Sequence, residues 1–321
     1  MVLNDFCLSE ICWFAGEVFE NASVNTLLSF IRKQGDEFTH VKVYSDTRHF
    51  PLTPEIIQLF RRDRFKENDS YISIFGTVED ELILSRIKTI GNPLITFARP
   101  CSGYNPYEVG SGISPSGGSQ TETTVEQKPY HSSQKHDSQW KPEIIGRDIR
   151  RYHVNVTGMR YVKYGPWLSA PRDPSNFQGK RILVQEITGG KDRRIVAAFY
   201  EDELYYSRDV IPIKLQSEIL HPFYLLALIN SRLLSWFHHK CSPKSQKTLF
   251  PKILVSDLKK IPIREVTIDK QKPIIDIAEQ IMAAKALDPE ADTAAWERKI
   301  DQLVYELYGL TEEEIAIVEG R

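Results

Sequence analysis

The sequence of 321 residues predicts an α+β protein. Short runs of β-branched and aromatic residues, broken by turn residues, fill most of the chain before Pro222, and such runs are typical of strands. After Pro222 the apolar residues recur at helical spacing. We therefore expect four segments: an α/β segment over 1–100, a Gly- and Ser-rich connector over 101–139, a mostly antiparallel β domain with a long helix over 140–265, and C-terminal helices over 266–321.

The first segment is expected to alternate strands and helices. The runs ICWFAGEVF, SVNTLLSFIRK and FTHVKVYSD are interpreted as strands, although the second also fits a short helix. Residues 53–65 are predicted to form a helix, because Thr53 can cap it and Pro54 suits its first position. A strand is expected at YISIFG, followed by a helix at VEDELILSRIKTIG that Gly91 closes.

The β domain is predicted from the basic, aromatic stretch between Trp140 and Val210. Its pieces EIIGRDIRRYHV, MRYVKYGPWL, GKRILVQEIT, RRIVAAFY and ELYYSRDVIPI read as strands of a compact, mostly antiparallel region. Arg and Lys alternate with Tyr, Trp and Phe throughout it. This mixture suits phosphate contact and stacking on bases, but it is also common on the surfaces of sheets.

Helices are predicted for most of the remaining chain. One begins after Pro222 and buries a stripe formed by Leu226, Ile229, Leu233 and Phe237. A basic loop follows, then a short helix begun by Ser256 and the strand IPIRE. Two tail helices are expected over 273–287, starting at Pro273, and over 292–308, ended by Gly309; Thr311 and Glu314 then form a capping box in a last turn.

Charge is strongly segregated along the chain, although the net charge is only −2. Residues 1–140 carry a net charge of −5, residues 141–265 one of +10, and residues 266–321 one of −7. A basic middle between acidic flanks indicates a polyanionic partner, for which nucleic acid is the leading candidate.

The cysteines, the histidines and the apolar runs limit other classes of function. Cys7, Cys12, Cys101 and Cys241 form no CxxC pair, so we predict neither disulfides nor zinc. His238 and His239 lie near Cys241, but adjacent helical side chains diverge, which disfavours a metal site. The longest apolar run, 219–237, is interrupted by polar residues, so we expect no membrane span. With no secretory signal at the N-terminus, the expected location is cytoplasmic.

Several sequence blocks resemble a known family. They are KPYHSSQKHDSQWKPEIIGRDIRRY, KYGPWLSAPRDPSNFQGKRILVQEI, YLLALINSRLLSWFHHK and FPKILVSDLKKIPI. In their order and spacing over about 85–265 they resemble the specificity region of TaqI-like adenine methyltransferases and of fused type II restriction-methylation enzymes. The ending ERKIDQLVYELYGLTEEE is similar to the tail of these enzymes and of type I specificity subunits.

The resemblance implies a DNA target recognition domain. Double-stranded DNA is then the expected partner, together with a catalytic methyltransferase or endonuclease domain or subunit. GEVFENASVNTLLSFIRK looks like the closing strands of a methyltransferase domain, so 1–100 is interpreted as the remnant of its end. S-adenosylmethionine and Mg²⁺ are expected for the missing catalytic parts, and no cofactor for this chain.

The triplet Asn105-Pro106-Tyr107 is close to the Asn/Asp-Pro-Pro-Tyr/Phe motif of DNA amino-methyltransferases. One proline is missing, no buried strand leads into it, and no Gly-rich turn could hold a methyl donor, so a turn is favoured. The alternative is a self-sufficient methyltransferase or nuclease. Its best acidic cluster, Glu201, Asp202 and Glu203, reads as a solvated turn, because nuclease carboxylates must converge on magnesium.

Candidate DNA contacts follow from the chemistry of base edges and phosphates. Side chains on a rigid scaffold can read bases, whereas flexible lysines neutralise phosphates. The predicted base readers are Arg147, Arg150, Arg151, Arg193 and Arg194, with Lys163, Tyr164 and Trp167 beside them; the predicted phosphate contacts are Lys240, Lys244, Lys247 and Lys252. Each arginine could instead be the partner of a surface ion pair.

Overall fold

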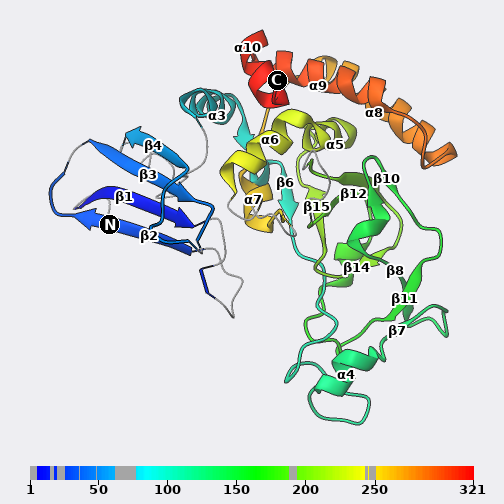
Figure 1. The fold of residues 1–321 in the computed structure, drawn as a ribbon. Coiled ribbons are helices and arrows are strands. Elements are labelled where there is room, and N and C mark those ends of the chain that lie inside the picture. Colours follow the sequence, from blue (N-terminus) through cyan, green and yellow to red (C-terminus); the bar gives the residue numbers. More distant parts are fainter. Residues whose placement is uncertain are drawn as a thin grey trace. The chain divides into compact units, whose positions relative to one another are not determined.

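The protein forms two compact units, 1–76 and 77–321. The computed structural model, drawn in Figure 1, describes residues 6–14, 18–19, 26–35, 37–47, 49–61, 77–187, 194–242, 245 and 251–321. The strand expected at YISIFG and the candidates Arg193, Lys244 and Lys247 lie outside these residues. Strands and helices occur together and most strand pairs are antiparallel, which confirms the α+β class.

The first unit is a four-stranded sheet in the order β2-β1-β3-β4. β1 is antiparallel to β2 and parallel to β3, and β3 is antiparallel to β4. Leu8, Ile11, Val41 and Phe60 form its small core. The strands span Cys7–Phe14 (β1), Thr26–Arg32 (β2), Phe38–Tyr44 (β3) and Ile56–Arg61 (β4).

The helix predicted over 53–65 is wrong, because this stretch contains strand β4. Ile56 lies opposite Val43 and Arg61 lies opposite Phe38 in the register with β3. Thr53 and Pro54 suggest a helix start, but the strand itself is rich in Ile, Leu and Phe. Pairing with an existing strand overrides the local helix signal, since propensity is only a weak prior. The second run, open to both interpretations, is strand β2.

The second unit is layered around the antiparallel sheet β13-β12-β15-β6. Successive side chains of a strand point to opposite faces. Ile182 and Val184 accordingly join the large core shared with the helices, whereas Leu183 joins a second core shared with the sheet β14-β8-β11-β7. The strands span Ala98–Pro100 (β6), His131–Ser132 (β7), Trp140–Ile144 (β8), Arg160–Lys163 (β11), Arg181–Gln185 (β12), Ala197–Tyr200 (β13), Tyr205–Tyr206 (β14) and Val210–Leu215 (β15).

Shorter elements complete this unit. Two short strand pairs extend the β structure. One is the hairpin of Ile149–Arg150 (β9) with His153–Val154 (β10), and the other joins Asn92–Pro93 (β5) to Pro262–Ile263 (β16). The helices are Val78–Ile90 (α3), Glu122–Gln127 (α4), Pro222–Asn230 (α5), Arg232–Cys241 (α6), Val255–Lys260 (α7), Ile268–Leu287 (α8), Ala294–Tyr308 (α9) and Glu312–Glu319 (α10), with 3₁₀ turns at Leu94–Thr96 (η1), Gly146–Asp148 (η2) and Pro174–Phe177 (η3).

The long helix expected after Pro222 is two helices. Ser231 interrupts it with φ −65° and ψ 153°, and the Ser231 hydroxyl accepts a hydrogen bond from the backbone N–H of Leu234. Ser231 is therefore the N-cap of α6, a role for which serine is among the preferred residues. The predicted stripe of Leu226, Ile229, Leu233 and Phe237 is nevertheless buried throughout.

Helix α8 begins five residues before the predicted start at Pro273. The reason is tertiary: Gln271 is fully buried, and its side-chain amide donates to the carbonyls of Ile219 and Val266 and accepts from His221 N–H. These bonds fix the first turn of the helix, and Pro273 lacks the N–H for only one intrahelical bond. The predicted capping box of Thr311 and Glu314 is present, but it opens the helix α10 rather than a single turn.

The connector over 101–139 is folded where it was expected to be a loop or only partly ordered. Gln120 is 1% exposed, and its side-chain amide donates to the carbonyls of Pro106 and Trp167. Tyr130 donates its hydroxyl proton to the carbonyl of Ile113. A polar composition is therefore ordered here, because side-chain hydrogen bonds act together with the burial of Tyr104 and Tyr130 in the second core.

None of the described helices is long and apolar enough to cross a membrane. No disulfide joins the four cysteines, all of which the structure describes.

Candidate nucleic-acid interface

The β9–β10 hairpin and the preceding turn η2 carry three of the candidates, Arg147, Arg150 and Arg151. Ile149 pairs with Val154, and Arg150 pairs with His153, which leaves Arg151 and Tyr152 at the tip. Tyr152 has φ +65°, in the left-handed region that non-glycine residues rarely adopt. Its side chain is buried in the helical core, and this burial offsets the conformational cost of about 1–2 kcal/mol. The tip is thereby held in one conformation.

A cavity of about 510 Å³, called the arginine cavity below, lies between this hairpin and the C-terminal helices. Arg147, Arg150 and Arg151 line it from one side, and Gln185 lines it from the end of β12. The tail contributes Lys285 of α8, Pro289 and Glu290 of the α8–α9 loop and Glu297 of α9. The structure therefore brings three predicted base readers together, and it adds tail residues that were not predicted.

Two of the three arginines in this cavity are available for a ligand. Arg147 and Arg150 are exposed, and within the described part of the chain neither has an ion-pair partner. Burial, followed by the nearby cations Lys285 and Arg150, lowers the pKa of the neighbouring His153. Free guanidinium groups at a cavity rim suit phosphate oxygens and the acceptor atoms of guanine.

Arg151 and Arg194 are instead bound to the tail helix α9. Arg151 forms an ion pair with Glu297. Arg194 is 9% exposed and donates to both carboxylate oxygens of Asp301, at 3.0 and 3.1 Å, and to the carbonyl of Asn230. Burial, followed by the like charge of Arg151, lowers the pKa of Arg194. These contacts give both side chains a role in joining the β domain to its tail.

Two of the four lysines predicted to contact phosphates, Lys240 and Lys252, lie in the described part of the chain. Lys240 Nζ lies 2.7 Å from Asp80 Oδ2 and also over the ring of Trp236, and Lys252 Nζ lies 3.0 Å from Glu186 Oε2. Both lysines are therefore paired with carboxylates in this structure. Lys244 and Lys247 belong to residues that the structure does not describe.

Lys163, Tyr164 and Trp167 gather at a different place from the arginine cavity. Lys163 Nζ lies 5.2 Å from the centre of the Trp167 ring, and Trp167 Nε1 donates to the carbonyl of Lys163. The Tyr164 ring packs among the aromatic residues of the second core, and its hydroxyl donates to the carbonyl of Arg172. Packing explains the positions of all three side chains.

A buried polar cluster lies beside them in the sheet β14-β8-β11-β7. Glu143 is fully buried and accepts hydrogen bonds from the hydroxyl of Tyr104 and from Arg160 Nε at 2.7 Å. His131 Nε2 lies 3.2 Å from the same carboxylate, and its Nδ1 lies 2.9 Å from the Tyr107 hydroxyl. Burial and the adjacent Glu143 carboxylate raise the pKa of Tyr104. The cluster satisfies its own hydrogen bonds, so its geometry is that of a structural network.

The triplet 105–107 is tied into this network rather than open to a ligand. The backbones of Asn105 and Ala170 exchange two hydrogen bonds, and the Asn105 side-chain amide donates to Glu108. The hydroxyl of Tyr107 accepts from the N–H of Tyr130. The preferred interpretation as a turn agrees with these contacts.

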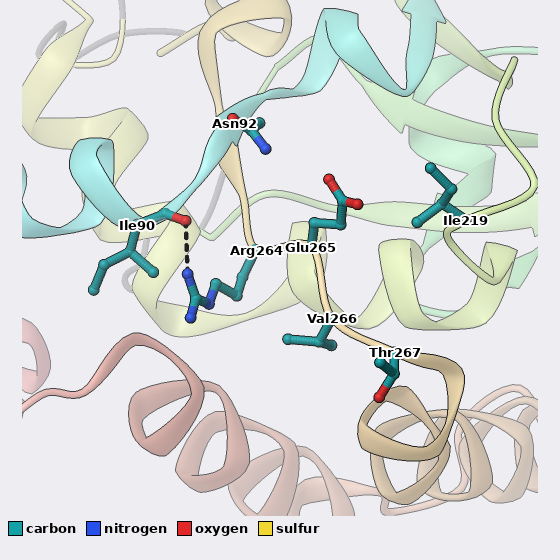
Figure 2. Close-up of a pocket in the computed structure, with 7 residues that line it drawn as sticks. All are labelled: Ile90, Asn92, Ile219, Arg264, Glu265, Val266 and Thr267. Carbon is teal, nitrogen blue, oxygen red and sulfur yellow. Dashed lines mark hydrogen bonds between the residues drawn. The ribbon is translucent and has the colours of Figure 1, made fainter.

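A second cavity, of about 490 Å³, lies where α3 ends and α8 begins (Figure 2). Ile90, Ile219 and Val266 form its apolar walls, and Arg264 Nη1 donates to the carbonyl of Ile90 at 3.0 Å. None of the predicted DNA contacts lines it. Among the described residues, no cluster of three His, Cys, Asp or Glu side chains could hold a metal ion.

Comparison with known proteins finds a family match in the middle of the chain. Residues 141–263 match the TaqI-like C-terminal specificity domain. This segment is similar to that domain. The matched segment runs from within β8 to the end of β16 and supplies Arg147, Arg150, Arg151 and Gln185 to the arginine cavity. The match confirms the resemblance that the sequence blocks showed.

One relative matches the chain beyond residues 141–263. A predicted type II restriction enzyme and methyltransferase of Methanocaldococcus jannaschii is 24% identical over 323 residues, covering 96% of this chain and 25% of that protein. The chain therefore spans about a quarter of the length of this relative.

Two solved structures align with the chain at low identity. The type IIL restriction-modification enzyme MmeI in complex with DNA aligns with a TM-score of 0.48 and 11% identity, covering 98% of this chain and 45% of that one. The HsdS subunit from Thermoanaerobacter tengcongensis aligns with a TM-score of 0.35 and 14% identity, covering 77% of this chain and 53% of that one.

Gln185 is the site residue that sequence reasoning missed. It follows the buried strand residues RILV and ends β12, so a polar residue directly after an apolar run was the available signal. Lys285, Glu290 and Glu297 gave no such signal, because they come from a tail whose packing against the hairpin is a tertiary feature.

Proposed function

We propose that the chain recognises a short sequence in double-stranded DNA, as the target recognition part of a restriction-modification system. One observation carries the proposal: within a segment that matches a specificity domain, Arg147 and Arg150 line a cavity, and their guanidinium groups have no ion-pair partner among the described residues. Base readout requires donors and acceptors held on a rigid scaffold, and the β9–β10 hairpin supplies one. The net charge of +10 over 141–265 would attract phosphates independently of sequence.

The partner of this module is a methyltransferase or endonuclease catalytic domain or subunit. The relative from Methanocaldococcus jannaschii, four times as long as the matched region, carries both activities in its name. We assign the sheet of the first unit to the end of a methyltransferase domain, on the resemblance of GEVFENASVNTLLSFIRK to its closing strands. A protein with this role acts in the cytoplasm.

We further propose that catalysis does not come from this chain. Its sequence lacks a Gly-rich strand-to-helix turn, and the triplet 105–107 lacks one proline of the catalytic motif. S-adenosylmethionine and Mg²⁺ are then needed by the catalytic partner only. Incubating the chain with DNA and labelled methyl donor, or with Mg²⁺, should give no turnover. Turnover that is lost on mutation of a residue in this chain would contradict this part of the proposal.

Selection of duplexes from a random library tests DNA recognition directly. The full chain should enrich a short motif, and the logarithm of its affinity should fall linearly with the logarithm of salt concentration, by about 0.9 per phosphate contact. The double variant Arg147→Ala/Arg150→Ala should lose enrichment of the motif. Lys272→Ala is the control, because Lys272 is an exposed cation of α8 that does not line the cavity.

Two results would overturn the proposal. One is the absence of binding to any duplex by the folded chain. The other is an affinity that does not depend on salt concentration. That result would indicate that the basic segment serves a protein interface instead of DNA.

A further inference from the structure

We infer that Gln185 is a specificity-determining residue that reads an adenine base. The inference rests on the proposed function, since it requires that duplex DNA approaches the arginine cavity. It adds a residue and a base that the family match does not assign.

The backbone of Gln185 is fixed from both sides. Its N–H donates to the carbonyl of Val196 at 3.0 Å, and in the register with β15 it lies opposite Val210. A β-carbon placed on Gly146 would lie 3.4 Å from Cγ of Gln185, so the glycine packs closely against this side chain. Gln185 is thus half-buried on a rigid strand, the kind of scaffold that bidentate base contacts require.

The side-chain amide of Gln185 has no hydrogen-bond partner within the described chain, although the residue lines the cavity. Two other charged residues of the lining are already engaged. Arg151 pairs with Glu297, and Lys285 Nζ donates to the carbonyls of Pro289 and Ala291. The polar groups left for a ligand are Gln185, Arg147, Arg150 and the exposed Glu290.

The chemistry of an amide selects adenine among the four bases. A glutamine offers one donor and one acceptor side by side, which match the N7 acceptor and the N6 amino donor of adenine. Phosphate oxygens only accept, so the flanking arginines suit them better than Gln185 does. Arg147 and Arg150 would then hold the neighbouring phosphates or a guanine while Gln185 contacts adenine.

Library selection with three variants tests the inference. The wild-type motif should contain a position that requires adenine. Gln185→Ala should lose about 10- to 100-fold in affinity for adenine at that position, with preferences elsewhere unchanged. Gln185→Glu, which keeps the size of the side chain but only accepts, should shift the preference at that position to cytosine. Gln178→Ala, an exposed glutamine of the same domain outside the cavity, should retain the wild-type motif.

The outcomes separate the two proposals. If Gln185→Ala and Gln185→Glu fold and enrich the wild-type motif while the double arginine variant does not, the role of Gln185 is refuted and DNA recognition stands. If the wild-type chain binds no duplex, both fall. Circular dichroism and the unfolding midpoint in urea confirm that each variant is folded, and Gln185→Glu alone decides the matter if Gln185→Ala is unstable.

Discussion

Arg194 and Asp301 form a buried ion pair between the β domain and helix α9, although they lie more than a hundred residues apart in the sequence. Both oxygens of Asp301 accept from Arg194 Nη2, and one oxygen also accepts from the backbone N–H of Arg232. Burial raises the pKa of Asp301 in spite of the opposing charge of Arg194. The pair fixes the tail beside the arginine cavity, because Glu297 and Asp301 belong to the same helix.

Breaking this pair should be costly. Asp301→Asn leaves the Arg194 cation buried without a counter-charge, which should lower the free energy of unfolding by about 3–5 kcal/mol. Urea denaturation at neutral pH measures the change. Glu290→Gln, at an exposed site in the same tail, should stay within about 0.5 kcal/mol of the wild type. An Asp301→Asn variant as stable as the wild type would show that the pair does not hold the tail.

Arg181 provides a second stability test, within strand β12. Its side chain is fully buried and donates to the carbonyls of Gly179, Phe177, Asp202 and Leu204 and to the hydroxyl of Tyr206. Arg181→Met should leave these acceptors unsatisfied and lower the free energy of unfolding by at least about 3 kcal/mol.

The matched control for Arg181 is Arg172→Met, which removes an exposed guanidinium of the same domain. It should have little effect on the urea midpoint. Equal midpoints for the two variants would exclude a structural role for Arg181.

His238 should make the stability of the protein depend on pH. It is 2% exposed in α6, its Nε2 has no hydrogen-bond partner among the described residues, and burial lowers its pKa from 6.5 to about 4. Between pH 6.5 and 4 the unfolded chain therefore binds more protons than the folded one. This contribution to stability is complete above pH 6.5 and falls with pH, by up to about 3 kcal/mol near pH 4.

Urea unfolding at several pH values from 7.5 to 4.5 measures that slope. His238→Gln should flatten it, whereas His136→Gln, at an exposed histidine, should leave it unchanged. A slope that both variants share with the wild type would assign the effect to other groups.

Lysines and arginines should differ in their effects on DNA binding. Replacing Lys244 and Lys247 with Ala should weaken binding to all duplexes alike and reduce the salt dependence by about 0.9 per lost phosphate contact. Arg150→Ala should cost about 1–3 kcal/mol on the preferred duplex and much less on others. Fluorescence anisotropy with a preferred and a scrambled duplex at several salt concentrations separates the two effects. Equal losses on both duplexes for Arg150→Ala would make Arg150 a phosphate contact.

The surroundings of the predicted DNA contacts could not be read from the sequence, for a physical reason. Sequence shows that Arg147, Arg150, Arg151 and Arg194 are basic, but not which carboxylate each will meet. Glu297 and Asp301 lie in a tail that folds back onto the β domain, and they engage Arg151 and Arg194 while Arg147 and Arg150 remain open. For every candidate residue, the undescribed Arg193, Lys244 and Lys247 included, the assignment as a DNA contact stays a prediction.

Local sequence determined those features that depend on nearby residues. Gly91 and Gly309 end α3 and α9, Thr311 caps α10, the apolar stripe after Pro222 is buried, and the sequence blocks already show the similarity to the TaqI-like specificity domain. Caps and stripes are short-range, since each needs only a few neighbouring residues to form.

Tertiary structure decided the features that depend on contacts between distant segments. Pairing with β3 made 56–61 a strand, hydrogen bonds of Gln271 moved the start of α8, and the packing of the tail against the β9–β10 hairpin built the cavity around Gln185. Such choices depend on partners far away in the chain, whose contacts outweigh local preferences worth only fractions of a kcal/mol per residue.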